Sequence, residues 1–334
     1  MNYDAILWVS FGGPEKEEDV IPFLENVLRG KNVPRERMLA VAEHYYHFGG
    51  RSPINQQNRD LIRALETELA AHGPHLPVYW GNRNWHPLLT DTVAKMKADG
   101  VRRALAFATA AYSSYSSCRQ YLENIENARA AAGEGAPVID KIRPFYNHPG
   151  YITAMTQQVQ QALAQFPAEG RSSAHIVYTA HSIPLRMAEN CQYSQQLLEA
   201  SILVSAALGR SGDPLVYQSR SGPPTQPWLG PDILEHLREI GRTGQVRDVA
   251  IVPIGFVSDH MEVLYDLDTE ARQLCEQLGL NMVRAAAVGT NPGFARMVRE
   301  LILERMEENS GRPCVGNLGP WPDVCPVGCC LPRA

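Results

Sequence analysis

The feature that most constrains the fold is a regular alternation of short apolar runs with amphipathic stretches of helical length. Several runs are continuous, which is typical of parallel strands covered by helices on both faces. The pattern predicts an α/β fold with right-handed crossovers. The predicted strands cover residues 3–12, 77–81, 103–109, 175–180, 215–219, 249–257 and 282–287. The predicted helices cover residues 17–28, 55–71, 88–99, 116–132, 150–166, 193–208, 232–240, 259–278 and 292–308.

The alternation is doubled along the chain, which predicts two Rossmann-like domains with parallel sheets flanked by helices. An active cleft is expected between them, at the carboxyl ends of the strands. Domain I is predicted over residues 1–112 with a returning helix at about 290–308, and domain II over residues 113–289. Residues 309–334 are rich in Pro, Gly and Cys and are predicted to form an appended tail.

Several classes of protein are disfavoured by the same sequence. The formal net charge is −5, which argues against a nucleic-acid binder. The turn after the first predicted strand, Ser10 to Pro14, lacks both glycine-rich nucleotide signatures. The apolar runs are shorter than the roughly 20 residues of a membrane span. No basic segment precedes the first run and no hydrophobic lip is visible near residues 48–54, so we expect a cytoplasmic protein without a stable membrane anchor.

A histidine and a series of carboxylates are the main candidates for chemistry. His181 follows a predicted strand, and Asp259, Glu262, Asp266 and Glu270 are spaced to share one face of a predicted helix. Like charges on one face repel unless a cation or a proton accompanies them. Histidine with carboxylate suits Fe²⁺ or Zn²⁺, and carboxylates alone suit hydrated Mg²⁺. The group predicts a path for a divalent cation and for protons.

Aromatic and basic residues at other strand ends predict a binding slot for a flat molecule with acidic groups. Aromatic rings would form the apolar walls, and arginine side chains at the rim would bind carboxylates in bidentate fashion. The predicted wall residues are Phe11, Tyr112, Tyr115, Tyr121 and Trp228, and the predicted rim residues are Arg29, Tyr45, Ser52 and Arg83.

Five segments, taken in order, resemble the ferrochelatase family. They are Ser-Phe-Gly-Gly-Pro at 10–14, Gly-Gly-Arg-Ser-Pro-Ile at 49–54, Thr-Ala-His-Ser-Ile-Pro at 179–184, Pro-Trp-Leu-Gly-Pro at 227–231 and Gly-Phe-Val-Ser-Asp-His-Met-Glu-Val-Leu-Tyr-Asp at 255–266. The chain looks most like the actinobacterial coproporphyrin III enzymes that carry an iron–sulfur cluster. The resemblance implies insertion of Fe²⁺ into coproporphyrin III in haem biosynthesis, with release of two protons. The alternatives are protoporphyrin IX as the substrate, a related Co²⁺ or Ni²⁺ chelatase, and a haem- or cluster-based sensor.

The resemblance also implies roles for particular residues. His181 and Glu262 would hold the metal, while Asp266 and Glu270 would form an outer metal site, with Mg²⁺ as its ion, or a proton path. Ser52, Tyr45 and Tyr121 would contact the porphyrin propionates. Phe11 stands where some bacterial members have a tyrosine that reaches the iron, and Arg83 replaces a lysine found in some relatives. Transient contact with neighbouring haem-pathway enzymes is a further expectation.

Four of the seven cysteines fall in the last 21 residues, which indicates a metal site. An odd number of cysteines without a signal peptide argues against a secreted disulfide scaffold. The resemblance implies a [2Fe–2S] cluster with a structural or sensing role, held by Cys118, Cys325, Cys329 and Cys330, with Cys314 in reserve. Zinc on the same ligands and redox-active free thiols are the alternatives. The remaining two, Cys191 and Cys275, are predicted to be buried or idle thiols.

Overall fold

The computed structural model describes residues 2–223, 225–307 and 310–331. The predicted end of the last helix at Glu308 and both ends of the predicted tail, at 309 and 332–334, lie outside these residues. The chain forms two compact units. Unit 1 comprises Met1–Thr109, Gln120–Ile142 and Val298–Gly311, and unit 2 comprises Ala110–Arg119, Arg143–Met297 and Arg312–Ala334.

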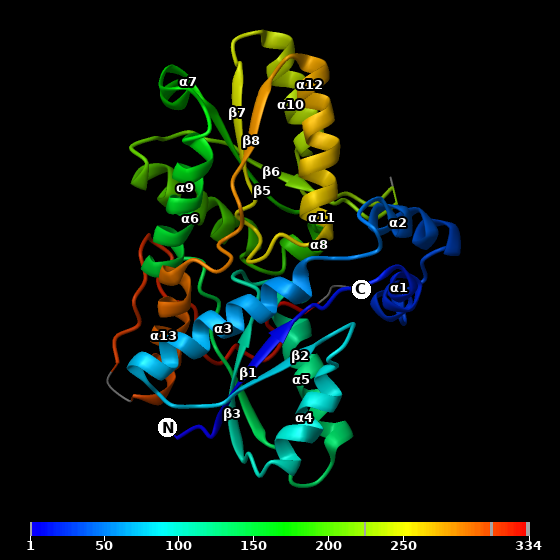
Figure 1. The fold of residues 1–334 in the computed structure, drawn as a ribbon, viewed down its shortest axis with the longest axis vertical. Helices are drawn as coiled ribbons and strands as arrows, with labels where there is room; N and C mark the ends of the chain where they lie inside the picture. The colour runs from blue at the N-terminus through cyan, green and yellow to red at the C-terminus, as the bar shows by residue number, and fades with distance from the viewer. Residues whose placement is uncertain (1, 224, 308–309, 332–334) are drawn as a thin grey trace. The chain divides into compact units, whose positions relative to one another are not determined.

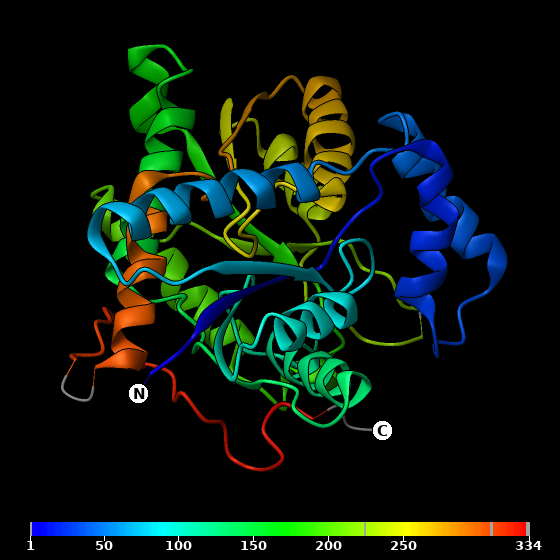
Figure 2. The ribbon, with the colours of Figure 1, turned by 60° about the horizontal axis from the view of Figure 1, so that its bottom comes forward.

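Unit 1 is built on a four-stranded parallel sheet in the order β2-β1-β3-β4. The strands are β1 (Ala5–Ser10), β2 (Val78–Asn82), β3 (Arg103–Ala108) and β4 (Val138–Lys141). Figure 2 shows α3 (Ile54–His72) on one side of β1 and β2, with α4 (Leu89–Ala98) and α5 (Gln120–Ala132) on the other. Trp8 on the central strand stacks on Phe107, and its indole nitrogen donates to Asn58 of α3. Two further helices are α1 (Val20–Leu28) and α2 (Arg35–His47).

Unit 2 repeats this plan with a parallel sheet in the order β6-β5-β7-β8. The strands are β5 (His175–His181), β6 (Leu215–Gln218), β7 (Asp248–Val252) and β8 (Asn281–Arg284). In Figure 1, α6 (Pro149–Leu163) and α9 (Tyr193–Ala207) cover one side of the sheet. The other side is covered by α10 (Ile233–Thr243) and α12 (Arg272–Leu278). The shorter helices are α7 (Ala168–Ser173), α8 (Leu185–Ala188) and α11 (Met261–Val263), and α13 (Pro292–Met306) has residues in both units.

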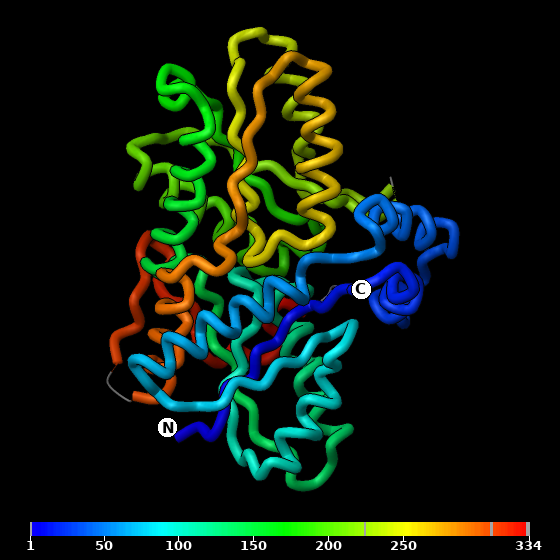
Figure 3. The backbone as a smooth tube through the Cα atoms, in the orientation of Figure 1, coloured from blue at the N-terminus to red at the C-terminus, as the bar shows by residue number. Residues whose placement is uncertain are grey.

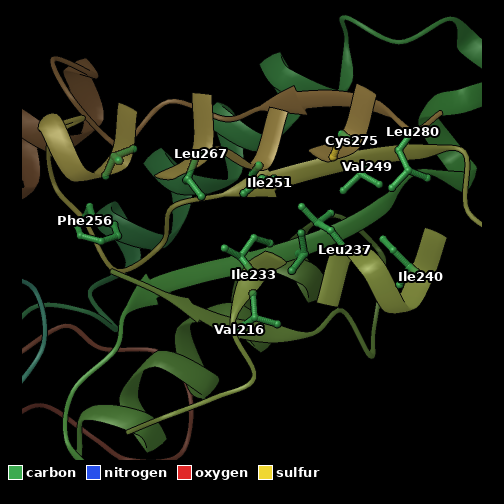
Figure 4. Close-up of a cluster of buried hydrophobic side chains, with 13 residues drawn as sticks. Val216, Ile233, Leu237, Ile240, Val249, Ile251, Phe256, Leu267, Cys275 and Leu280 are labelled. Carbon is green, nitrogen blue, oxygen red and sulfur yellow. The ribbon is translucent and has the colours of Figure 1, made fainter. Parts of the chain in front are cut away.

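The core beneath α10 shows how the amphipathic pattern builds unit 2. Ile233, Leu237 and Ile240 recur at helical spacing and pack with Val249 and Ile251 of β7 (Figure 4). Burying one such side chain contributes about 1.5–3 kcal/mol relative to leaving it exposed. The helix is also fixed at its start, because the side chain of Asp232 accepts a hydrogen bond from the backbone of Leu234.

The predicted α/β class with two parallel sheets is confirmed, and Figure 3 traces its strand–helix alternation along the chain. Four elements were not predicted from the sequence, namely β4, α2 and the short helices α7 and α8. The compact units also divide the chain differently from the predicted domains, since α5 and β4 belong to unit 1 and residues 312–331 belong with unit 2. The described part of the chain has no helix that is long and apolar enough to cross a membrane.

Candidate active site

His181 and Glu262 form the centre of the site in unit 2. His181 ends β5, and its Nδ1 lies 2.5 Å from the carbonyl oxygen of Ser182. Because a carbonyl oxygen only accepts hydrogen bonds, Nδ1 carries the proton of the neutral imidazole and Nε2 keeps its lone pair. That Nε2 lies 3.6 Å from Oε2 of Glu262, and both side chains are partly open to solvent. A lone pair and a carboxylate at this separation can share one divalent cation or pass a proton.

His260 is a member of this site to which the sequence analysis gave no role. Its Nδ1 accepts a hydrogen bond from the backbone N–H of Glu262 at 3.2 Å and so caps the start of α11. Its ring packs edge-to-face on Phe256. Burial lowers the pKa of His260, the negative charge of Glu262 raises it, and the neighbouring His181 lowers it. The signal that could have found it is its place two residues before Glu262, at the start of the predicted helix.

Three carboxylates continue from this centre along a π-helix. Glu262 lies on α11, which runs directly into the π-helix Leu264–Ala271, and this carries Asp266 and Glu270. A π-helix closes i→i+5 hydrogen bonds, so residues four apart are about one turn apart. π-Helical segments are also common at functional sites. The predicted grouping of these three acids is present, but on a wider helix than the one expected.

Of these three acids, which together form the carboxylate column, Asp266 has the largest shift in pKa. Burial raises the pKa of Asp266 to about 7, the hydrogen bond from Ser219 opposes this, and the charges of Glu262 and Glu270 raise the pKa further. Its Oδ2 accepts hydrogen bonds from Ser219 Oγ and, at 3.2 Å, from Gln218 Nε2. Burial, and then the charge of Asp232, raises the pKa of Glu270. Asp266 can therefore exchange a proton near neutral pH.

The prediction that Asp259 shares this acidic face is wrong. Asp259 precedes α11, and its Oδ1 pairs with Nη1 of Arg284 at 2.8 Å. The same oxygen accepts a hydrogen bond from the backbone of Ala287. Arg284 also pairs with Asp268. Asp259 is thus neutralised by an arginine on β8 and fixes the loop before the helix.

Trp228 lies on a segment that is bonded to the residues following His181. Ser182 Oγ donates to the carbonyl of Leu229 at 2.7 Å, and Pro184 and Trp228 form an antiparallel bridge. A Cβ on Gly222 would collide with Nε1 of Trp228, so only glycine leaves room for the indole. Trp228 was predicted as a wall of the binding slot, and its segment is bonded to the residues that follow His181.

A second group, in unit 1, brings together three of the predicted binding residues. The Arg83 guanidinium lies 4.7 Å from the ring centroid of Tyr121 and 5.6 Å from that of Phe11. Its Nε donates to Asn124 at 2.6 Å. A guanidinium over aromatic faces is oriented by cation–π attraction. Trp85, which the sequence analysis did not single out, packs with Phe23 beside this group.

The other predicted binding residues of unit 1 have different surroundings. Tyr45 is buried and packs edge-to-face on Phe23. Ser52 is buried. Its Cβ would lie only 2.8 Å from a Cβ added to Gly13, so Gly13 leaves the room that Ser52 occupies. Arg29 is the C-cap residue that follows α1, and its side chain donates to Asn26 of that helix.

The wall prediction for Tyr112 is wrong. Tyr112 is 1% exposed and belongs to the core of unit 2. Its hydroxyl donates to the carbonyl of Ile254 at 2.9 Å, and the hydroxyl of Tyr151 donates to the same carbonyl at 2.8 Å. Burial raises the pKa of Tyr112 well above the usual range of a phenol. The hydrogen bond from Tyr112 to Ile254 therefore helps to fix the segment that follows β7.

The thiols of unit 2 come together from distant parts of the chain. Cys118 and Cys330 are buried, and the sulfur atoms of Cys329 and Cys330 lie 3.4 Å apart. Burial and then Cys329 raise the pKa of Cys330, and the nearby thiols of Cys118 and Cys191 raise it further. Tail and body thiols thus share one neighbourhood, and their soft donors suit a thiolate-bound metal. In the parts of the chain that the structure describes, no three histidine, cysteine or acidic side chains are arranged as a finished metal site.

The comparisons with known proteins identify the family. The model of the ferrochelatase family matches residues 3–306. The chain belongs to the ferrochelatase family. It is 57% identical to "Ferrochelatase" of Rhodopirellula baltica, over 98% of this chain and 93% of that protein. It is 52% identical to "Coproporphyrin III ferrochelatase" of Streptomyces coelicolor, over 99% of this chain and 94% of that protein. The family that the five segments resemble is therefore confirmed.

Solved chelatases share the fold at much lower identity. SirB of Bacillus subtilis, in complex with cobalt, is 12% identical with a TM-score of 0.55, covering 94% of this chain and 99% of that one. CbiX, described as the terminal enzyme of sirohaem biosynthesis in denitrifying bacteria, is 16% identical with a TM-score of 0.51, covering 91% and 100%. Both likenesses concern the fold, and they support the predicted chelatase architecture.

Proposed function

We propose that this ferrochelatase-family chain inserts Fe²⁺ into coproporphyrin III, giving Fe-coproporphyrin III and two protons. The observation that carries the proposal is the pairing of His181 Nε2 with the Glu262 carboxylate at 3.6 Å. The names of relatives at about 50% identity, such as those from Streptomyces coelicolor and Nocardia farcinica, favour coproporphyrin III as the substrate.

In this proposal His181 and Glu262 act on both halves of the exchange. The carboxylate of Glu262 and the Nε2 lone pair of His181 replace water on the incoming Fe²⁺. When its lone pair is not on the metal, Nε2 is also the proposed acceptor for pyrrole protons, because the hydrogen bond from Nδ1 to Ser182 places the lone pair of the neutral ring on Nε2. Once the imidazole of His181 has taken a proton, the neighbouring carboxylate of Glu262 stabilises the imidazolium.

The protons then leave along the carboxylate column. Asp266 has a pKa of about 7, so it can accept a proton from the centre and release it to solvent through the exposed Glu270. The same two acids are proposed as the outer metal site for hydrated Mg²⁺. A cation there would compete with the proton on Asp266, and chelation of Mg²⁺ then raises the proton occupancy of that carboxyl.

The porphyrin contacts are proposed for seven residues. Trp228 and Phe11 would pack on the macrocycle, and distortion of the ring would turn the pyrrole lone pairs towards the metal at a strain of about 1–5 kcal/mol. Four further residues are proposed to contact the propionates or their surroundings, namely Arg29, Tyr45, Ser52 and Tyr121. Arg83 already lies against two aromatic rings and would supply a bidentate donor to a propionate.

A competition assay tests the substrate. The purified chain is given Fe²⁺ under anaerobic conditions with equal concentrations of coproporphyrin III and protoporphyrin IX, and both products are separated and quantified. We expect Fe-coproporphyrin III to predominate. Predominance of haem would overturn the substrate while leaving iron insertion in place. Faster insertion of Co²⁺ or Ni²⁺ than of Fe²⁺ would show that Fe²⁺ is not the preferred metal.

We also propose that the thiols of unit 2 hold a [2Fe–2S] cluster, with Cys118, Cys325, Cys329 and Cys330 as its ligands. The support is the shared neighbourhood of Cys118, Cys329 and Cys330 and the four thiolates that such a cluster requires. When bound, the group would cross-link the tail to the body of unit 2. The test is the visible spectrum and the EPR spectrum of the dithionite-reduced protein after anaerobic purification. Zinc in its place, measured by metal analysis, would overturn the cluster.

We further propose that the protein is cytoplasmic. We also propose that it makes transient contacts with neighbouring enzymes of haem biosynthesis that supply the porphyrin or accept the product. Cross-linking in intact cells followed by pull-down of the tagged chain tests the contacts.

A further inference from the structure

Cys191 is the one thiol near the tail cysteines, within the described residues, to which the proposed cluster gives no role. It lies between α8 and α9, is half-buried, and its sulfur contacts the carbonyl of Met187 at 3.2 Å. Burial raises the pKa of Cys191, and the nearby thiol of Cys329 raises it further. The expectation that Cys191 is an idle thiol of a helix does not describe this setting.

A hydrogen bond ties the Cys191 segment to the end of the tail. The side-chain nitrogen of Asn190 donates to the carbonyl oxygen of Leu331. Asn190 directly precedes Cys191, and Leu331 directly follows Cys330. The Asn190 side chain therefore holds the backbone at Leu331, and each of these two residues is one position away from a cysteine. Cys191 thus lies next to the Cys329–Cys330 pair through contacts that no metal provides.

The possible thiol pairs differ in their geometry. Cys329 and Cys330 are neighbours in sequence, and their Cα atoms are therefore held about 3.8 Å apart by a trans peptide. A disulfide usually spans about 4.4–6.8 Å between Cα atoms, so a disulfide between Cys329 and Cys330 would be strained. Cys118 and Cys330 are only 3% and 5% exposed, which shields them from a dissolved oxidant. Cys191 is half-buried and comes from a different segment; of the half-buried tail thiols Cys314, Cys325 and Cys329, Cys329 is the one whose charge acts on it.

We propose that Cys191 and Cys329 are a disulfide-forming pair that closes the thiol site when it holds no metal and the chain meets a hydroperoxide. Hydrogen peroxide oxidises one thiol to a sulfenic acid, RSH + H₂O₂ → RSOH + H₂O. The other thiol then displaces water, RSOH + R′SH → RSSR′ + H₂O. The two sulfur atoms together lose two electrons and both thiol protons, and the peroxide oxygens leave as water. A dithiol reductant reverses the bond by exchange.

The bond has a direct consequence for the site. Cys329 is a proposed cluster ligand, so its disulfide withholds one thiolate until reduction and protects that sulfur from irreversible oxidation. The inference concerns the chain without a bound group. It stands or falls independently of the iron-insertion activity and of which metal the thiols carry.

Peptide mapping tests this pairing directly. The full-length chain is reduced, freed of metal with a chelator, treated with a stoichiometric amount of hydrogen peroxide, alkylated and digested with trypsin. The sequence places Cys118 on peptide 104–119, Cys191 on peptide 187–210 and all tail cysteines on peptide 306–333. We expect the main cross-link to join 187–210 to 306–333, with fragment ions that locate it at Cys329. Dithiothreitol should remove it.

Matched cysteine variants provide the controls. The cross-link should be lost in C191S and in C329S and should persist in C325S and in C275S, because Cys275 is buried on α12. A cross-link of peptide 306–333 to 104–119, or one that persists in C329S, would overturn the pairing. So would a wild-type chain in which Cys191 is fully alkylated after peroxide treatment.

Discussion

Replacing Asp266 with Asn should stabilise the fold more at pH 8 than at pH 5. The carboxyl of Asp266 has a pKa of about 7 in the folded chain against an ordinary value of 3.8. Asn keeps the shape and one oxygen, so it can still accept the hydrogen bond from Ser219, and it carries no charge at any pH. The substitution therefore isolates the free energy of burying the ionised form.

The sign and size follow from the two pKa values. Between pH 3.8 and about 7 the unfolded chain has lost the Asp266 proton while the folded chain keeps it, so wild-type stability falls as pH rises through this window. At 1.36 kcal/mol per pKa unit, the buried Asp266 carboxyl lowers the free energy of unfolding by about 2 kcal/mol at pH 5 and by about 4 kcal/mol at pH 8. Above about pH 8 it levels off because both states are ionised.

Urea unfolding of wild type and Asp266→Asn, followed at pH 5 and pH 8 with a chelator present, measures this difference. The chelator removes cations that would bind the carboxylate and mask the effect. We expect the advantage of the variant to grow by about 2–3 kcal/mol between the two pH values. An advantage that is equal at both pH values, to within about 0.5 kcal/mol, would refute the reasoning. The variant should also insert iron more slowly, since it cannot relay a proton.

Three further substitutions have outcomes that the structure sets. Burial lowers the pKa of His148 to about 4, so wild type should lose about 3 kcal/mol of stability as pH falls from 6.5 to 4 and His148→Asn should not, as measured by urea unfolding. Gly222→Ala should displace the Trp228 indole, lower stability by about 1–3 kcal/mol and weaken porphyrin binding in a fluorescence titration. Tyr193→Phe removes the hydrogen bond to the backbone carbonyl of His181 and should lower stability by about 0.5–1.5 kcal/mol in thermal unfolding, whereas an unchanged melting temperature would contradict this.

Most of the fold could be predicted from the sequence because its strands are apolar enough to be seen without context. β1, with the sequence Ala-Ile-Leu-Trp-Val-Ser, is buried at every position. β4 was missed because it is four residues long, lies at the sheet edge and includes Asp140 and Lys141. α2 was missed because it buries only three residues and begins after Pro34 without a side-chain cap.

The site was predictable in its members and less so in its geometry. His181 and Glu262 stand in motifs, but no periodicity shows that Nδ1 bonds to the backbone and frees Nε2. The spacing of the acids was interpreted as α-helical, but Glu262 lies on α11, Asp266 and Glu270 lie on the π-helix that follows it, and Asp259 lies before both. Asp259 pairs with Arg284, which lies 25 residues further along the chain. Contacts of this kind are tertiary and leave no local signal.

The central claim is that the pair of His181 and Glu262 inserts Fe²⁺ into a porphyrin. The most direct measurement is the anaerobic conversion of coproporphyrin III by wild type and by His181→Ala, followed through the Soret and Q bands, with circular dichroism to compare their folds. The account predicts rapid conversion by wild type and no turnover by a folded His181→Ala variant. Near wild-type turnover by that variant, or no conversion by wild type with porphyrin bound, would contradict it.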